Sequence, residues 1–304
     1  MVYRSTSRIV FQICNYTFFV LFSVSILLPF INAISISLSS YAEVAQGNIG
    51  LWPKGWNTDA YVRLMANMSF LRSFGNSVFL TATNTVLVIL FSLCAGFALA
   101  HKHMVGRKVV FTYILVTMFF NGGLIPTYLV VNALGLTNTY FALIFPSVCN
   151  VFYIIIFKNV IDQMPKDLLE AAEMDGAGEI STLFRVVLPL VLPMTAAFTV
   201  FSAVAYWNEW FNVLIYIRKE ALWTLQFHLR SILNDTISIN TIMLDAMIKG
   251  QDRIHPQNVK MAALMITVLP IVMIYPFVQK YFIHGQFVGA VKGRWRRGGG
   301  RYGG

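Results

Sequence analysis

The acidic residues of this 304-residue chain gather in one stretch, residues 158–185, which holds six of its 13 Asp and Glu residues together with three Lys or Arg residues. The stretch therefore carries a net charge of −3, whereas the whole chain carries +10. Anionic lipid headgroups repel an acidic excess of this kind. The chemistry that these residues can do is charge-assisted binding, and we expect the partner to be a protein.

The spacing inside this stretch predicts a short helix, a tight turn and a second helix. Asp167 is placed to cap the first helix, and Glu170 three residues later completes an Asp version of the capping box. Gly176 and Gly178 are expected to end that helix and to turn the chain. The second helix is expected to begin near Glu179 and to run back into apolar sequence. A rigid, glycine-hinged unit of this kind is suited to docking.

Several sequence motifs of catalysis are absent from the chain. It contains no G-x(4)-G-K-[ST] sequence that could cradle a nucleotide phosphate, and no H-E-x-x-H zinc motif. Its five His residues show no metal-ligand spacing. We therefore predict that the chain is not an enzyme and holds no metal or cofactor of its own. Any ATP and Mg²⁺ are expected to bind a separate ATPase subunit.

The composition predicts an all-α, polytopic membrane protein that is surrounded by the lipid bilayer and binds no nucleic acid. Hydrophobic residues make up 57% of the chain and charged residues 12%, against about 25% charged residues in soluble proteins. A helix of about 20 apolar residues crosses a bilayer, and the uncharged runs of the sequence are long enough for six such helices. The predicted spans cover about 9–38, 73–100, 109–131, 140–157, 186–217 and 261–282, within a membrane domain of residues 1–293.

The distribution of Lys and Arg predicts the orientation. Six spans place both termini on the same side as the 101–108 turn and the 158–185 loop. That side carries 14 Lys and Arg residues and the opposite side 9, so the termini are expected to be cytoplasmic. The Gly/Arg-rich run of residues 294–304 is either a native tail or an appended tag, and without its four arginines the count is 10 against 9.

One motif in the acidic stretch resembles that of a known family. Glu170-Ala171-Ala172 is followed by Gly176, Val186 and Leu188-Pro189. This is similar to E-A-A-x(3)-G-x(9)-I-x-L-P, the coupling motif of permease subunits in bacterial binding-protein-dependent ABC importers, with Val186 in place of Ile as the one departure. Residues 10–293 as a whole resemble the maltose-type second permease of the carbohydrate branch. The runs that carry this likeness are 121–128, 134–139, 207–210, 225–230 and 279–285.

The resemblance implies the type I ABC importer permease fold in the bacterial cytoplasmic (inner) membrane. It also implies four partner chains: two ATPase subunits, a second, related permease chain and an extracytoplasmic solute-binding protein. In this family the coupling loop, here residues 158–185, lies in a cleft of the ATPase, whose closure on ATP drives alternating access. The ATPase-coupling residues implied are Asp167, Glu170, Ala171, Ala172, Glu173, Asp175, Gly176, Leu188 and Pro189.

The resemblance further implies a sugar or oligosaccharide as the imported solute, with alginate or another acidic oligosaccharide as the narrower reading. A permease for a non-sugar solute stays open as an alternative. A secondary transporter is less favoured, because the sequence shows neither an internal repeat nor a pair of carboxylates inside the spans.

Two groups of residues are candidates for the substrate pathway. The first interrupts the third span, where unwound backbone either faces a wet pathway or allows a close helix crossing. The second lies at the outer end of the fifth span, where it either contacts sugar or shapes the outer gate or the binding-protein contact. The candidates are Asn121, Gly122, Gly123, Tyr128, Trp207, Asn208, Glu209 and Trp210.

The outer interval of residues 218–258 is much longer than a link between two spans requires, and such length is typical of a functional loop. Its apolar residues predict that it is partly ordered. We expect it to contact the binding protein and to help release the sugar, the role that an outer loop has in the maltose-type family. The candidate contacts are Arg230, Asn240, Lys249 and Gln251.

Overall fold

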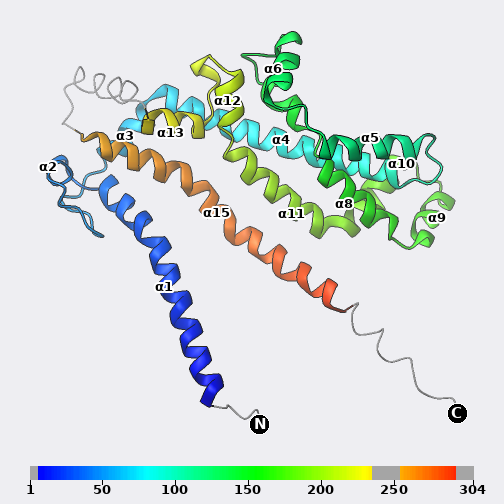
Figure 1. Ribbon diagram of the computed structural model, residues 1–304, viewed down its shortest axis with the longest axis horizontal. Coiled ribbons are helices and arrows are strands. Elements are labelled where there is room, and N and C mark those ends of the chain that lie inside the picture. The colour runs from blue at the N-terminus through cyan, green and yellow to red at the C-terminus, as the bar shows by residue number, and fades with distance from the viewer. Residues whose placement is uncertain (1–5, 235–253, 292–304) are drawn as a thin grey trace. The chain divides into compact units, whose positions relative to one another are not determined.

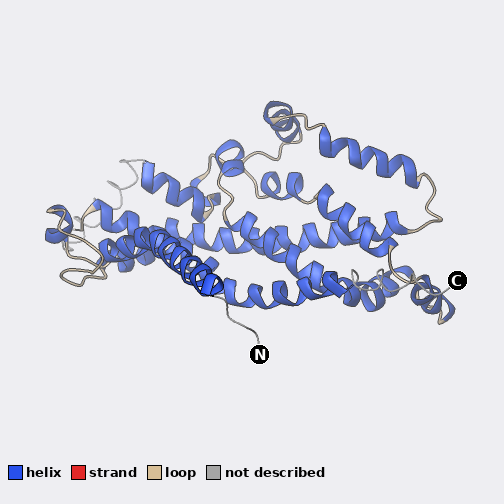
Figure 2. Ribbon diagram, turned by 60° about the horizontal axis from the view of Figure 1, so that its bottom comes forward, coloured by secondary structure: helices blue, strands red, loops and turns tan. Residues whose placement is uncertain are grey.

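The computed structural model describes residues 6–234 and 254–291, and these residues form helices with no strand among them (Figure 1, Figure 2). The prediction of an all-α fold is therefore confirmed. The chain divides into two compact units. Unit 1 comprises residues 1–71 and 228–269, and unit 2 comprises residues 72–227 and 270–304.

Four helical stretches in the described residues are long and apolar enough to cross a membrane, and two bent helix pairs bring the number to the predicted six if each pair is one span. The four are α1 (Thr6–Ser37), α4 (Met68–Ala100), the stretch from Glu179 to Trp207, and α15 (Pro256–Val291). The bent pairs are α5 (Arg107–Phe119) with α6 (Leu124–Ala133), and α7 with η1 (Phe141–Ile144, Phe145–Ser147) followed by α8 (Val151–Asp162).

Shorter helices connect these elements. Before α4 lie α2 (Tyr41–Ala45) and α3 (Asp59–Ala66), and α9 (Lys166–Met174) follows α8. The stretch from Glu179 consists of α10 (Glu179–Thr182), the π-turn η2 (Leu183–Val187) and α11 (Leu188–Trp207). After it come α12 (Phe211–Tyr216), η3 (Glu220–Leu222) and α13 (Leu225–Asn234).

The third predicted span, residues 109–131, is not one continuous helix. α5 and α6 are bent by 118° at the break between them. The Asn121 side chain accepts a hydrogen bond from the Gly123 N–H at 2.9 Å, and Gly123 has a φ of +87°. An Asx turn followed by a glycine with positive φ is incompatible with continued α-helix, so the local sequence accounts for the break.

The fourth and fifth predicted spans also differ from the helices of the structure. The span predicted at 140–157 bends by 40° after η1, which contains Pro146, and α8 then continues to Asp162. The Asn150 side chain caps α8 by accepting the Tyr153 N–H at 3.1 Å. The span predicted at 186–217 ends earlier, at Trp207, because the chain leaves the helix there and begins α12 separately.

In unit 1, one buried amide joins the end of α1 to the start of α15. The Asn258 side-chain nitrogen donates to the carbonyls of Ile36 and Ser39, each at 2.7 Å. The hydroxyls of Ser37 and Tyr61 lie 2.7 Å apart, which ties α1 to α3. Because a buried amide without partners costs free energy, these bonds favour one pairing of the three helices.

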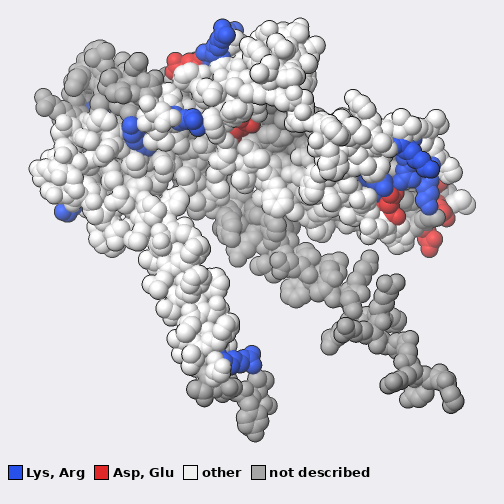
Figure 3. Space-filling view, viewed as in Figure 1, with Lys and Arg blue, Asp and Glu red and all other residues white. Residues whose placement is uncertain are grey.

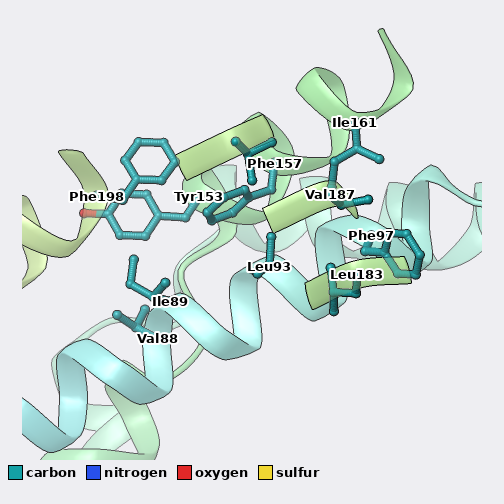
Figure 4. Packing of buried hydrophobic residues seen from close by; sticks show 11 residues of the cluster. Val88, Ile89, Leu93, Phe97, Tyr153, Phe157, Ile161, Leu183, Val187 and Phe198 are labelled. Atoms are coloured by element: carbon teal, nitrogen blue, oxygen red, sulfur yellow. The ribbon is translucent and has the colours of Figure 1, made fainter. Parts of the chain in front are cut away.

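The core of unit 2 lies where α4, α8 and the Glu179–Trp207 stretch meet (Figure 4). Tyr153 of α8 stacks on Phe198 of α11 with 4.2 Å between ring centroids, and Phe157 meets the same ring edge-on at 5.4 Å. Leu93 of α4 and Val187 of the π-turn are buried in the same cluster. This cluster holds α4, α8 and the Glu179–Trp207 stretch together.

Gly96 allows α4 to approach α8 closely. A Cβ at this position would lie 2.6 Å from the Phe157 Cβ and 3.0 Å from the Lys158 backbone nitrogen. Gly96→Ala is therefore expected to destabilise the fold by about 1–3 kcal/mol through overpacking. Thermal inactivation of the detergent-solubilised protein measures the change.

Gly75 in the same helix is the matched control, because a Cβ there would meet nothing within 4 Å. Gly75→Ala is expected to leave the stability unchanged or raised by up to about 1 kcal/mol, since alanine favours helix over glycine. Equal shifts of the inactivation temperature in the two variants would show that α4 and α8 do not touch at Gly96.

Candidate functional site

We call the predicted coupling loop (residues 158–185) together with the four residues after it the coupling segment. The loop folds as the sequence predicted: α9, a glycine turn, then α10. The turn is a Schellman motif, in which the Ala177 N–H bonds to the Ala172 carbonyl and the Gly176 N–H to the Glu173 carbonyl, both at 3.0 Å. Gly176 occupies the left-handed region with a φ of +75°. The motif satisfies the last carbonyls of α9, so the turn holds a defined angle between the two helices.

The predicted capping box at the start of α9 is wrong. The helix begins at Lys166 with Pro165 as its N-cap, and no side chain caps it. Pro165 has a φ of −56° and a ψ of 125°, so helical geometry begins two residues earlier than an Asp167 cap would require. Asp167 lies inside the first turn, where its negative charge still interacts favourably with the helix dipole.

α9 is attached to its own chain along one face. Leu169 packs against the core cluster of unit 2, and Ala172 is buried with 9% exposure. Glu170, Ala171 and Glu173 are exposed. Of the two alanines predicted to allow a partner's close approach, only Ala171 is accessible, whereas Ala172 allows α9 to approach this chain's own helices.

The tip of the coupling segment carries an exposed apolar surface beside its acids. Met174 is 88% exposed and Ile180 76%, and Leu168 and Phe184 are also exposed. The sequence analysis missed this surface. The signal was available, because Met174 and Ile180 flank a turn where a solvated loop would carry polar residues. An apolar tip rimmed by carboxylates is suited to an apolar cleft with a basic edge.

The base of the coupling segment is joined to the 101–108 turn by ion pairs. Arg107 donates from one terminal nitrogen to both Asp162 oxygens at 3.1 and 3.2 Å, and Lys158 contacts the same carboxylate at 2.7 Å. The Arg107 Nε donates to the Leu99 carbonyl at 2.6 Å. His101 lies 3.4 Å from Glu179. The 101–108 turn and the coupling segment therefore lie at the same end of unit 2, as their predicted location on one membrane side requires.

A groove of about 260 Å³ separates this turn from α9. His101, Asp162, Glu170 and Glu173 are among its lining residues. Carboxylates from the predicted coupling motif thus face the basic turn across a solvent-accessible space. Figure 3 shows the charges of both signs gathered at this end of unit 2.

The Leu188-Pro189 pair marks a π-turn rather than a helix start. The Leu188 N–H bonds to the Leu183 carbonyl, five residues back. Pro189 has no N–H to bond the Arg185 carbonyl, and its ring would clash in a regular α-helix. The wider π-turn accommodates the proline, so the helix continues from Glu179 to Trp207 for 29 residues.

The break at Asn121, Gly122 and Gly123 is a bend and not a close helix crossing among the described residues. A Cβ at Gly123 would meet nothing within 4 Å, and one at Gly122 would meet only Pro126 at 3.7 Å. All three residues are exposed on this chain. Tyr128 stacks on Tyr216 of α12 with 6.2 Å between ring centroids. The bend is therefore on the surface of unit 2, where a ligand or another chain could contact it.

The four candidate residues at the predicted outer end of α11 have different environments. Trp207 is buried with 7% exposure and packs edge-on against Phe74, so its ring does not face a pathway in this conformation. The Glu209 carboxylate accepts from the N–H and the side-chain amide of Asn212, both at 2.9 Å, and so caps α12. Exposed Asn208 and half-buried Trp210 remain accessible. The geometry favours a helix-end cluster over four direct sugar contacts.

The outer interval is partly ordered, as predicted. α13 buries Leu225, Leu229 and Ile232, so these apolar residues pack on the chain itself rather than await a partner. Two α4 side chains hold the start of the interval: Asn76 donates to the carbonyls of Ala221 and Trp223 at 2.9 Å, and Ser77 accepts the Leu225 N–H at 2.7 Å.

One of the four predicted binding-protein contacts lies within the described residues and three lie outside them. Arg230 is exposed on α13. Asn240, Lys249 and Gln251 lie outside the described residues. A contact between this interval and a binding protein therefore stays a prediction.

Residues 92–286, more than half of the chain, match a protein family described as "Binding-protein-dependent transport system inner membrane component". The chain belongs to this family. The matched range contains the coupling segment, both bent helix pairs and the outer interval.

Individual relatives cover almost the whole chain. It is 41% identical to protein LplC of Bacillus subtilis over 287 residues, which is 93% of this chain and 95% of the relative. It is 35% identical to the polygalacturonan/rhamnogalacturonan transport system permease protein YtcP of the same organism, covering 93% of this chain and 98% of YtcP. A solved structure, of a bacterial ABC transporter involved in the import of the acidic polysaccharide alginate, matches 93% of this chain and 100% of its own with a TM-score of 0.86 and 32% identity.

The glycine turn yields a prediction with an internal control. Gly176 has a φ of +75° and Gly178 a φ of −70°, and an added Cβ at either would meet nothing within 4 Å. Gly176→Ala is expected to cost about 1–2 kcal/mol of local stability because of its left-handed conformation, whereas Gly178→Ala is expected to cost little. Hydrogen–deuterium exchange of peptides spanning residues 166–182 should then be about 5- to 30-fold faster only for Gly176→Ala. Similar exchange in both variants would contradict the Schellman geometry.

Proposed function

We propose that this chain is the membrane-spanning subunit of an ATP-driven importer of sugars or oligosaccharides, and that it forms half of the translocation pathway. Its membership of the binding-protein-dependent family supports the transport role. The observation that carries the coupling role is the coupling segment itself. Its exposed tip of apolar and acidic side chains is fixed to the inner ends of the spans by ion pairs and by the Schellman turn.

Partner ATPase subunits supply the energy in this proposal. A pair of them binds ATP and Mg²⁺, and the coupling tip, with Glu170, Ala171 and Met174 exposed, lies in a cleft of one subunit. Closure of the ATPases displaces the tip. Because Glu179–Trp207 is one continuous helix, the displacement reaches the outer end of α11 without an intervening loop.

The remaining partners complete the pathway. A second, related permease chain covers the open side of unit 2 and encloses the α5–α6 bend between the two chains. An extracytoplasmic binding protein delivers the solute to the outer interval. The coupling segment and both termini are cytoplasmic, and the chain spans a bacterial inner membrane.

The solute class that we propose is an acidic oligosaccharide. Two observations support it: YtcP is named for transport of polygalacturonan and rhamnogalacturonan, and the structural relative imports the acidic polysaccharide alginate. Both polymers that YtcP transports contain uronic acid units, as alginate does. A non-sugar solute is the alternative that an uptake assay would reveal.

The proposal is tested with the complete transporter reconstituted in vesicles. ATPase activity in the presence of binding protein should rise on addition of uronic acid oligosaccharides and not on addition of neutral oligosaccharides of equal length. Glu170→Lys is expected to abolish most of this stimulation, because it reverses a charge on the exposed tip. Glu43→Lys reverses a charge on α2, which belongs to unit 1 and not to the unit that holds the coupling segment, and it is the control expected to retain stimulation.

Each outcome of this experiment bears on a separate part of the proposal. Full stimulation in assembled Glu170→Lys transporter would rule out the tip as the coupling contact. Stimulation by neutral sugars alone would leave the importer intact and replace the proposed solute class. Absence of stimulation by any oligosaccharide would indicate a different solute.

A further inference from the structure

The first turn of α5 and the adjoining side of α8 form an open groove with a volume of about 590 Å³. Lys158 of the coupling segment lines it, and it shares Lys102 with the groove beside α9. Its polar lining is cationic: Lys102, Arg107, Lys108 and Lys158 all contribute. No Asp or Glu is among its lining residues.

Two of these four cations share a single carboxylate. Asp162 alone is shared between Arg107 and Lys158. Arg107 uses its Nε and one terminal nitrogen for Leu99 and Asp162, which leaves its second terminal nitrogen without a partner among the described residues. Lys108 is exposed and forms no ion pair within the described part of the chain. The groove therefore presents several N–H donors to an anion.

The backbone adds to this preference for an anion. α5 begins after Gly106, which has a φ of +75° and gives the helix no side-chain cap. No side chain caps the first turn of α5, although the Arg107 N–H bonds to the Met104 carbonyl at 3.3 Å. Lys108 and Val109 of this turn both line the groove, and the N–H groups at a helix start favour an anion. A phosphate group accepts several hydrogen bonds at once and matches this combination of cations and amide groups.

The groove opens onto an apolar surface. None of the residues of α5 is buried within the chain, and Val109, Tyr113 and Phe119 are each more than 70% exposed. Residues 109–157 contain no charged side chain. Phe111 lines the groove and lies under the Lys158 ammonium, 4.8 Å from its ring centroid. A ligand that fits the whole feature has an anionic head and a long apolar body.

We propose that this groove binds an anionic phospholipid, with the headgroup phosphate on Lys108 and Arg107 and the acyl chains along α5. Basic grooves between transmembrane helices on the cytoplasmic side are suited to anionic headgroups. The bound lipid holds the start of α5 beside α8 at the base of the coupling segment. The inference goes beyond the transport role, since lipid binding requires neither ATP nor solute.

The test uses the assembled transporter in a neutral detergent and a fluorescent phosphatidylglycerol, whose binding is followed by anisotropy. Unlabelled phosphatidylglycerol should displace the probe, whereas phosphatidylcholine and equimolar inorganic phosphate should not. Lys108→Gln is expected to weaken binding about fivefold and Lys108→Glu more, because each lysine near an anionic headgroup contributes roughly that factor. Lys219→Gln removes one exposed lysine far along the chain and should change the dissociation constant less than about twofold.

Four results would overturn the proposal. Equal displacement by phosphatidylcholine would show that the headgroup charge is not recognised. Displacement by equimolar inorganic phosphate would assign the groove to a free anion. Unchanged binding in both Lys108 variants would show that the lipid binds elsewhere on the transporter. No saturable binding to the assembled transporter would show that the groove is not a lipid site. Since Lys108 is exposed, the variants are expected to fold, and an unchanged thermal inactivation temperature checks this.

Discussion

The ion pairs of Asp162 hold together the end of unit 2 that carries the coupling segment. Asp162 is the last residue of α8 and bonds Arg107, the first residue of α5, and Lys158, one turn earlier on α8. Arg107 also holds the Leu99 carbonyl near the end of α4. Isolated surface ion pairs contribute little to stability, but a carboxylate shared by an arginine and a lysine forms a small network that restricts the geometry more than a single pair does. The Asp162 carboxylate thus joins α5 to α8, and Arg107 extends the junction to α4.

This junction attaches the coupling segment to a rigid part of unit 2. Between Asp162 and the tip there is one short helix whose Leu169 and Ala172 face is packed on the chain. Beyond the tip, the helix from Glu179 runs through the π-turn into α11 without a loop. The close approach of α4 and α8 at Gly96 completes the frame. In the proposed importer, displacement of the tip would therefore move α8 and α11 together rather than bend a flexible connection.

Much of this arrangement followed from local sequence. The all-α fold, the glycine turn at Gly176 and the start of the second helix near Glu179 depend on hydropathy and turn preferences within a few residues, which a single sequence displays directly. The motif that begins at Glu170 indicated the binding-protein-dependent transport family to which this chain belongs. The same local reasoning placed the interruption of the third span correctly, but not its 118° angle, which α5 and α6 show only once folded.

The features that sequence reasoning missed depend on what else packs nearby. Asp167 has the right residue type for a cap, but Pro165 starts the helix before it. Ala171 and Ala172 are indistinguishable in sequence, and only the docking of α9 buries the second. For Trp207 and Glu209 the sequence left sugar contact and a helix-end cluster as alternatives, because nothing local revealed the α12 cap or the Phe74 contact. Arg107 and Asp162 are 55 residues apart, so no local pattern pairs them.

The central claim is that the Arg107–Asp162 junction transmits displacement of the coupling tip to the spans. A charge-swap cycle in the reconstituted transporter tests it most directly, with solute transported per ATP hydrolysed as the quantity measured. Arg107→Asp and Asp162→Arg should each lower this ratio severalfold, and the double variant should recover most of it because the opposite charges again face each other. If both single variants keep the wild-type ratio, or if the double variant is as poorly coupled as the singles, the junction does not carry the coupling.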